Sequence, residues 1–169
     1  MNVTIRKFER DDIPKKVEWI NNPANNQFLH YDLPLEVEKT QKWFDNNIGR
    51  TDRFDAVIEV DGVPCGTIGL LSIDRKNSKA EFYIAMGETS LKGKGVSTQA
   101  TRLMIDYAFN VLLLNRVYSF IEVENIPSIK LVEKVGFIRE GRLKNDIMSH
   151  GQPVDRFAYG ICKEDYLKE

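Results

Sequence analysis

The first 47 residues pass from a strand pattern to two helix patterns. Val3 to Phe8 alternates apolar and polar side chains, which is the period of a half-buried strand. The acidic pair Asp11-Asp12, followed by Pro14, is typical of a helix start, and this helix should end near Asn21-Asn22-Pro23. A second helix is predicted from about Leu35 to Asn47, so this part of the chain reads strand, helix, helix.

Residues 56–86 carry three strand patterns separated by turn residues. Ala56 to Val60 and Val63 to Ile73 are joined by Asp61-Gly62, a pair strongly preferred in tight hairpin turns. After a second turn, over residues 74–78, Lys79 to Met86 is predicted as the third strand. Consecutive strands joined by hairpins favour antiparallel pairing in this part of the protein.

A helical pattern follows, and it is the strongest periodic signal in the chain. Its apolar residues recur in steps of three and one: Ala100, Leu103, Met104, Tyr107, Ala108, Val111 and Leu112. Beyond it we expect a strand, a short helix closed by Gly136, and a last hairpin with its turn at His150-Gly151-Gln152. These four elements cover Val117–Val123, Pro127–Val135, Arg142–Met148 and Val154–Cys162.

The element order is therefore β-α-α-β-β-β-α-β-α-β-β. Hairpin-linked strands followed by alternating strands and helices predict an α+β fold, a single mixed, mostly antiparallel sheet of about seven strands flanked by about four helices. The 169 residues, 42% of them hydrophobic and 29% charged, fit one globular domain spanning residues 1–169.

Charge and cysteine content argue against several function classes. The 24 Lys and Arg residues nearly balance the 25 Asp and Glu residues, which counts against a large nucleic-acid-binding surface. Two cysteines and two histidines without metal-ligand spacing predict no metal. The longest apolar run is Val111 to Leu114, so no membrane span is expected. The charged N-terminal segment lacks the apolar core of a signal peptide, and the expected location is the cytoplasm.

The segment Lys92-Gly93-Lys94-Gly95-Val96-Ser97-Thr98 joins the third of these strands to the long helix. Two glycines at alternating positions let backbone N–H groups turn toward a ligand, and the helix start adds its positive dipole end. The segment could therefore bind a pyrophosphate; the alternative is a flexible loop with Ser97 or Thr98 as an ordinary helix cap. It matches neither a P-loop, because Glu88 stands where the first glycine is needed, nor the dinucleotide fingerprint, because Thr98 replaces its third glycine.

A second segment, Glu122 to Phe137, reads as a strand end, Asn125-Ile126-Pro127-Ser128, a short helix and a closing Gly136-Phe137. Together with the glycine loop it resembles the two signature motifs of the GNAT superfamily of acetyl-CoA-dependent N-acetyltransferases. The resemblance is closest to the branch that acetylates ribosomal-protein N-termini and to its spermidine-acetylating relatives. It also includes Trp19-Ile20-Asn21-Asn22-Pro23, Ala80-Glu81-Phe82 and Gly136-Phe137-Ile138-Arg139-Glu140-Gly141, and the element order is similar over nearly the whole chain.

Acetyl-CoA is the cosubstrate that this resemblance implies. The glycine loop would bind the CoA pyrophosphate, and the third strand, splayed from its neighbour, would offer amides to the pantetheine arm and the thioester carbonyl. The cofactor-binding residues implied in this way are Ile84, Ala85, Met86, Lys92, Gly93, Lys94, Gly95, Val96, Ser97, Thr98, Asn125, Ser128 and Lys130.

The chain departs from the family pattern at Val132, where many relatives have a tyrosine that protonates the leaving thiolate. Valine cannot donate a proton, so this catalytic role is carried over to Ser128, which matches a serine used by some members of the branch. The acceptor ammonium must also lose a proton. In relatives an acid at the place of Glu81 faces the acceptor, so the resemblance implies Glu81 as the general base. The alternative is that Glu81 is a solvated strand carboxylate, and Glu122 is then the second candidate.

The expected reaction is direct acetyl transfer to a primary amine within a ternary complex. The acceptor stays open among a polyamine, a protein or peptide N-terminus and an amino sugar, and the predicted substrate-binding residues are Phe28, His30, Tyr31, Asp32, Glu81 and Glu122. No nucleic-acid or membrane partner is expected, and a homodimer is one possible assembly. The alternative function is a CoA-binding or sensing module without turnover, which the missing tyrosine at Val132 keeps open.

Overall fold

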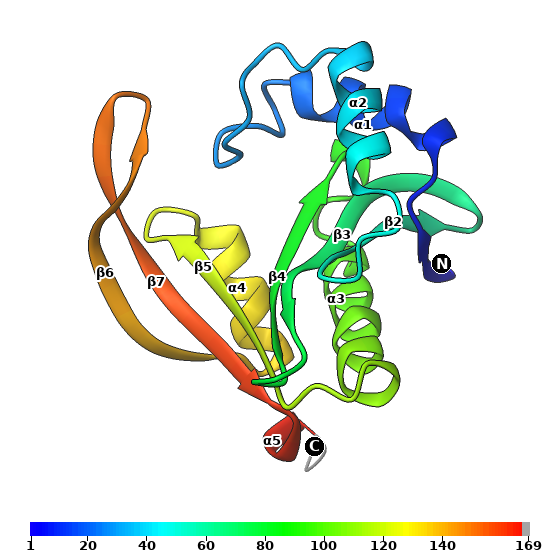
Figure 1. Cartoon of the computed structure of the whole chain (residues 1–169). Coiled ribbons are helices and arrows are strands. Elements are labelled where there is room, and N and C mark those ends of the chain that lie inside the picture. The colour runs from blue at the N-terminus through cyan, green and yellow to red at the C-terminus, as the bar shows by residue number, and fades with distance from the viewer. Residues whose placement is uncertain (167–169) are drawn as a thin grey trace.

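The computed structural model describes residues 1–166 and is built on one seven-stranded sheet (Figure 1). The strand order is β1-β2-β3-β4-β5-β7-β6, and all neighbouring pairs are antiparallel except β4 and β5, which are parallel. The strands are β1 Val3–Lys7, β2 Phe54–Val60, β3 Val63–Asp74, β4 Lys79–Met86, β5 Arg116–Glu122, β6 Ile138–Ser149 and β7 Gln152–Cys162. The predicted mixed, mostly antiparallel sheet is confirmed. The single domain was predicted over residues 1–169, and the last three of these, 167–169, lie outside the described residues.

Five α-helices lie within residues 1–166: α1 Ile13–Asn21, α2 Val37–Asn47, α3 Val96–Asp106, α4 Ile126–Val135 and α5 Lys163–Tyr166. Short 3-10 turns cover Arg10–Asp12 and Thr89–Leu91, and α3 continues as a π-helical turn over Tyr107–Val111. The sequence pattern predicts the first four helices, whereas α5 is a single turn and too short to show a hydrophobic period. In this part of the chain, no helix combines the length and the apolar content needed to cross a membrane.

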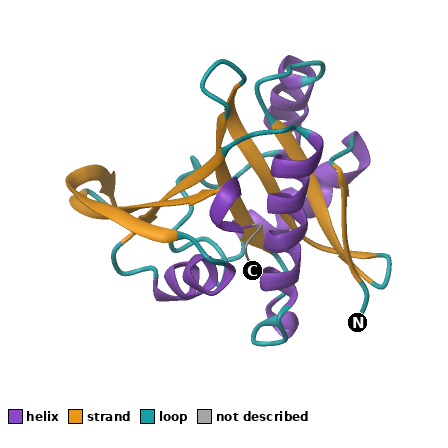
Figure 2. Cartoon of the chain, turned by 90° about the horizontal axis from the view of Figure 1, so that it is seen from below, coloured by secondary structure: helices purple, strands orange, loops and turns teal. Residues whose placement is uncertain are grey.

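The sheet has a hydrophobic core on each face, and the alternation along β2 separates the two. Ala56 and Ile58 belong to the larger core, which α3 and α4 share on one face of the sheet (Figure 2). Val57, between them, packs in the smaller core with Phe8 and Ile13, next to α1 and α2. Because successive side chains of a strand point to opposite faces, the two helix pairs cover opposite sides of the sheet.

β4 and β5 pair only at their N-terminal ends. Lys79–Glu81 pairs with Arg116–Tyr118, and beyond these residues the strands diverge (Figure 1). Just past the last pair, the Ser119 hydroxyl donates a hydrogen bond to the Phe82 carbonyl oxygen over 3.2 Å. β4 remains paired with β3, and β5 with β7, up to their C-terminal ends. The splay therefore leaves two facing strand edges whose backbone groups an extended ligand could satisfy.

β6 and β7 form a long hairpin that extends away from the rest of the sheet (Figure 1). His150 and Gly151 form the turn at its tip, with φ angles of +51° and +77°. The pattern predicts β6 over Arg142–Met148, but the strand begins earlier, at Ile138. Residues 138–141 are exposed and lack an apolar alternation, so their pairing with β7, and not burial, makes them a strand.

Candidate active site

The glycine loop before α3 presents its backbone to the outside of the protein. Gly93 and Gly95 have φ angles of +77° and +81°, and a Cβ atom at either position would meet no heavy atom within 4 Å. The Gly95 carbonyl accepts the first hydrogen bond of the helix, from Gln99 N over 3.1 Å. The amides of the first turn, Val96 to Thr98, have no helical acceptor before them and can donate to an anion.

Ser97 and Thr98 are not the helix caps that the alternative interpretation of this loop requires. Gly95 takes the cap position, and both hydroxyl residues lie within the first turn of α3. Their side chains therefore belong to the same turn as the free amides, and the exposed residues Lys92 and Lys94 add positive charge to the loop. This combination of backbone donors, dipole and cations fits a pyrophosphate group.

Ile84, Ala85 and Met86 lie on β4 where it has separated from β5. Each is paired with β3 on one side and is half-buried. Within residues 1–166, no strand pairs with these three residues on the β5 side. Their edge of the sheet can therefore hydrogen-bond an extended ligand, in the way that a strand edge binds an added strand.

Asn125 begins α4 as its N-terminal cap. Its Oδ1 atom accepts a hydrogen bond from Ser128 N over 3.3 Å, so this side chain has a structural role. Ser128 itself is half-buried in the first turn, and Lys130 is exposed. Val132 is 2% exposed and belongs to the larger core, so its side chain packs against protein.

Glu81 lies at the apex of the splay. It is the last residue of β4 that pairs with β5, opposite Tyr118, and it is half-buried. The next residue, Phe82, packs in the larger core, so alternation directs Glu81 to the face that carries α1 and α2. Burial raises the pKa of the Glu81 carboxyl, and the charge of Arg156 opposes this rise. A carboxyl group with a raised pKa in a cleft is a candidate for proton transfer.

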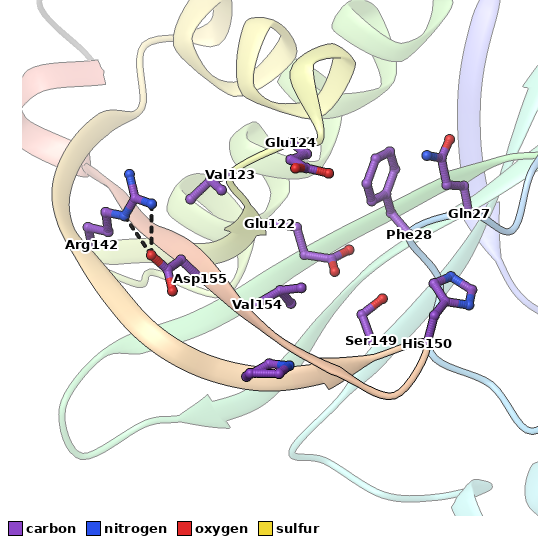
Figure 3. Close-up of a pocket in the computed structure, with 11 residues that line it drawn as sticks. Gln27, Phe28, Glu122, Val123, Glu124, Arg142, Ser149, His150, Val154 and Asp155 are labelled. Atoms are coloured by element: carbon purple, nitrogen blue, oxygen red, sulfur yellow. Dashed lines mark hydrogen bonds and ion pairs between the residues drawn. The ribbon is translucent and has the colours of Figure 1, made fainter.

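A cavity of about 410 Å³ lies between the tip of the hairpin, the end of β5 and the loop that joins α1 to α2. Glu122 is 8% exposed there, and its Oε2 atom accepts no hydrogen bond from the described residues. Figure 3 shows this carboxylate pointing into the space between Phe28 and the hairpin residues Ser149 and His150. The lining residues are Gln27, Phe28, Glu122, Val123, Glu124, Arg142, Ser149, His150, Pro153, Val154 and Asp155.

A second cavity, of about 570 Å³, lies between β4 and the helices α1 and α2. Phe28 lines both cavities, and His30 Nε2, in the second cavity, lies 3.5 Å from Glu122 Oε2, in the first. The two cavities are therefore neighbours. The second is lined by Lys16, Phe28, Leu29, His30, Tyr31, Leu35, Lys39, Thr40, Trp43, Arg53, Leu71, Glu81, Tyr83, Ile84 and Ala85.

The tertiary structure brings most of the predicted acceptor residues to these cavities. Those that line one or both are Phe28, His30, Tyr31, Glu81 and Glu122. Asp32 is exposed in the same loop and lines neither cavity. Sequence reasoning missed Lys16 and Tyr83, although Tyr83 shares the alternation of Glu81, and Lys16 lies three residues after the buried Ile13 on α1. Trp43 lies on the second helix, which was expected to line the acceptor pocket, but it was not singled out.

A metal site and a reactive cysteine are the remaining kinds of catalytic group to consider. Residues 1–166 contain no group of three His, Cys, Asp or Glu side chains arranged to hold a metal ion. The expectation that the protein uses no metal stays a prediction. Cys65 is buried, and burial raises the pKa of its thiol to about 11, so the thiolate is scarce at neutral pH.

Comparison with known proteins decides the family. The sequence model of the family described as "Acetyltransferase (GNAT) domain" matches residues 2–138, which is most of the chain. The chain belongs to the GNAT acetyltransferase family. This confirms the resemblance that the glycine loop and the α4 segment indicated, and with it the prediction that the protein is an acyltransferase.

Members of this family and their structures show how far the similarity extends. Spermidine N(1)-acetyltransferase of Escherichia coli K12 is 30% identical, over 99% of this chain and 90% of its own. YdaF of Bacillus subtilis, named as a candidate ribosomal N-acetyltransferase, is 36% identical over 68% of this chain and 62% of its own. The crystal structure of a Vibrio cholerae spermidine N-acetyltransferase with CoA and spermine is 26% identical, covers 98% of both chains and has a TM-score of 0.90. The predicted GNAT fold is thus confirmed.

Proposed function

We propose that this GNAT protein transfers acetyl from acetyl-CoA to a primary amine by direct attack within a ternary complex. The observation that carries the proposal is the position of Glu81, a half-buried carboxylate at the apex of the β4–β5 splay that also lines the second cavity. An amine in this cavity and a thioester in the splay would meet at Glu81. Holding the two reactants in contact removes most of the entropic cost of their encounter.

The glycine loop and the edge of β4 would hold the donor. Acetyl-CoA supplies an acetyl group activated as a thioester when it is bound. The first-turn amides of α3, with Lys92 and Lys94, would bind its pyrophosphate. The backbone of residues 84–86 would hold the pantetheine arm and polarise the thioester carbonyl. The Vibrio cholerae relative, whose structure contains CoA, supports acetyl-CoA as the donor.

Glu81 would receive the proton of the acceptor. An alkyl ammonium has a pKa of roughly 10 and therefore lacks a free lone pair at neutral pH. A carboxylate beside it can take the proton, either directly or through a water molecule. Burial raises the pKa of Glu81, which brings its basicity closer to what proton transfer near neutral pH needs. Glu122, in the neighbouring cavity, is the second candidate for this role.

Ser128 would return a proton to the departing sulfur, with water as the alternative donor. Val132 takes the position where many GNAT proteins have a tyrosine, but it is a core residue without a proton to donate, so it cannot be the acid. A CoA thiol with a pKa of about 8.5 is a tolerable leaving group, which lowers the need for a dedicated acid.

Relatives and charge indicate which acceptors to examine first. The similarity to spermidine acetyltransferases favours polyamines, and the similarity to YdaF adds peptide N-termini. Glu122 and Glu124 in the first cavity would attract the ammonium form of either. The homodimer, the cytoplasmic location and the absence of a metal stay predictions.

An acceptor-dependent thiol-release assay tests the proposal. Acetyl-CoA is incubated with the protein and with polyamines, peptides with free N-termini, or amino sugars. The released CoA thiol is measured, and the masses of the products are determined by mass spectrometry. The expected result is CoA release with one acetyl group added to the acceptor. Tight acetyl-CoA binding without turnover on any acceptor would contradict the proposal and favour the CoA-binding module.

A further inference from the structure

The second cavity is lined by three cationic side chains, Lys16, Lys39 and Arg53. Two of them are neutralised by neighbours, because Lys39 pairs with Glu36 over 3.4 Å and Arg53 pairs with Asp55 over 2.7 Å. Within residues 1–166, no carboxylate lies close enough to Lys16 to form an ion pair. Lys16 therefore brings an uncompensated positive charge to the cavity that also contains Glu81.

Lys16 lies on the buried face of α1, with its ammonium group among aromatic rings. Its Nζ atom is 3.6 Å from the ring centroid of Trp43, 5.5 Å from that of Phe8 and 5.9 Å from that of Tyr31. The residue is only 8% exposed. Ring faces attract a cation but accept no ordinary hydrogen bond, so they offset only part of its desolvation. Burial lowers the pKa of Lys16 to about 8, which leaves it mostly protonated at neutral pH.

Asp55, whose charge acts on Lys16, is already engaged elsewhere. Arg53 donates two hydrogen bonds to its carboxylate, over 2.7 and 2.8 Å, and the Tyr83 hydroxyl donates a third over 2.5 Å. These partners use most of the acceptor capacity of the Asp55 carboxylate. The Lys16 ammonium is therefore a donor that a bound anion could engage.

The neighbouring cavity has the opposite charge. Asp155 is neutralised by Arg142 over 2.7 Å, but Glu124 and Glu122 remain. The His30 imidazole lies 3.5 Å from Glu122 Oε2 and would compensate this charge only when protonated, and the atom has no hydrogen-bond donor among the described residues. A cationic group would be favoured on this side and an anionic group at Lys16. The negative charge of the first cavity and the positive charge of Lys16 thus lie in neighbouring cavities, and Phe28 lines both.

We infer that the acceptor amine also carries an anionic group, a carboxylate or a phosphate, which Lys16 binds while the amine lies at Glu81. This inference rests on the proposed function and narrows its substrate class. At Lys16 itself a second ammonium group would be repelled, so this residue favours an amine that carries an anion over a polycation in the second cavity. Lys16 thus acts as a specificity-determining residue and takes no part in the chemical step.

Matched acceptor pairs test the inference. Ornithine and putrescine differ by a carboxylate, and glucosamine 6-phosphate and glucosamine differ by a phosphate. We expect the anionic member of at least one pair to have a kcat/KM about tenfold higher, as expected for one charge-assisted hydrogen bond. The pair that shows the preference identifies which anion is bound. Calorimetric titration of both pairs into the CoA-bound protein should give the same preference in Kd.

Substitutions at Lys16 separate charge from packing. Lys16→Met should lower kcat/KM and affinity for the anionic member about tenfold and leave the neutral or cationic member unaffected or improved. Lys16→Arg, which keeps the charge, should retain the preference. Lys15→Met is the matched control, because Lys15 is exposed on the same helix, pairs with Glu18 and lines neither cavity.

Two results would overturn the inference. One is a wild-type protein that shows no preference in either pair, binding both putrescine and glucosamine as tightly as their anionic partners, and the other is a Lys16→Met variant with an unchanged preference. Either result, together with acetylation of plain amines, leaves the proposed function intact. A protein that acetylates no amine contradicts the proposed function, and the calorimetric preference then still decides whether Lys16 binds an anion.

Discussion

The hydroxyl group of Ser119 donates a hydrogen bond to the carbonyl oxygen of Phe82, over 3.2 Å, at the point where β5 and β4 separate. Ser119 is buried, so the bond is shielded from water and holds the apex of the splay next to Glu81. The loss of such a bond costs about 1 kcal/mol. We expect Ser119→Ala to raise the KM for acetyl-CoA about threefold to tenfold in steady-state kinetics. The exposed Ser90→Ala is the control, and an unchanged KM would limit Ser119 to a role in stability.

Gly95 offers a test of the CoA loop that separates ligand binding from backbone strain. Gly95→Val should abolish measurable acetyl-CoA binding in calorimetry, because its side chain would enter the open space over the loop. Gly62→Val is the matched control, since Gly62 has the same φ of +81° and equally open surroundings at the β2–β3 turn. Both variants should lose about 1–2 kcal/mol of stability from strain, but only Gly95→Val should lose the ligand. Equal affinity in the two variants would contradict the loop assignment.

Glu81 should control the pH dependence of the reaction. A general base works when deprotonated, so kcat/KM should rise with pH, and the raised pKa of Glu81 places this rise above the range of an ordinary glutamate. Glu81→Gln should lower kcat/KM about 10²-fold and remove the rise, with acetyl-CoA affinity unchanged. The exposed Glu38→Gln on α2 is the control. A higher KM with normal kcat would mean that Glu81 only binds the acceptor, and Glu122→Gln would then be the next variant.

Ser128 and Val132 together test how the thiolate is protonated. If Ser128 is the acid, Ser128→Ala should lower kcat more than KM, measured at saturating acetyl-CoA. A wild-type kcat in this variant would leave water as the donor. Val132→Tyr should not restore a missing acid, because Val132 is packed in the core. The larger side chain should instead cost about 1–3 kcal/mol of stability in denaturant unfolding.

Lys16 should make stability depend on pH in the alkaline range. Burial lowers its folded-state pKa from 10.5 to about 8. Between these values the unfolded chain holds a proton that the folded protein lacks, so stability rises with pH. At neutral pH the buried charge costs stability, which Lys16→Met removes. The advantage of Lys16→Met over wild type in denaturant unfolding should therefore shrink by about 2 kcal/mol between pH 7 and pH 10. If the stability difference between Lys16→Met and wild type did not change with pH, Lys16 would have the same pKa in the folded and the unfolded protein.

Local patterns in the sequence determined the elements that depend on near neighbours. Asp61 and Gly62 form the tight turn that their preference for positive φ predicts, with φ angles of +50° and +81°. The apolar period around Ala100 predicts α3, and its buried residues form one face of that helix. The glycine loop and the α4 segment identify the family because a phosphate cradle and a capped helix start are both built from consecutive residues. The family resemblance pointed to the acidic residue of β4, and alternation, which is also local, predicts that Glu81 and Phe82 point to opposite faces of the strand.

Only the tertiary structure decided what surrounds these residues. β7 pairs between β5 and β6, and this order brings the hairpin tip, Glu122 and Phe28 to one cavity although they lie far apart in the chain. The helical position of Lys16 indicates burial, yet its charge is left uncompensated because Asp55, on β2, is already engaged by Arg53 and Tyr83. Hydrophobic periodicity indicates which side of a helix or strand is buried, but it does not indicate which other element packs against that side. Strand order and side-chain contacts between distant segments follow from packing of the whole chain, and these contacts set the charge of both cavities.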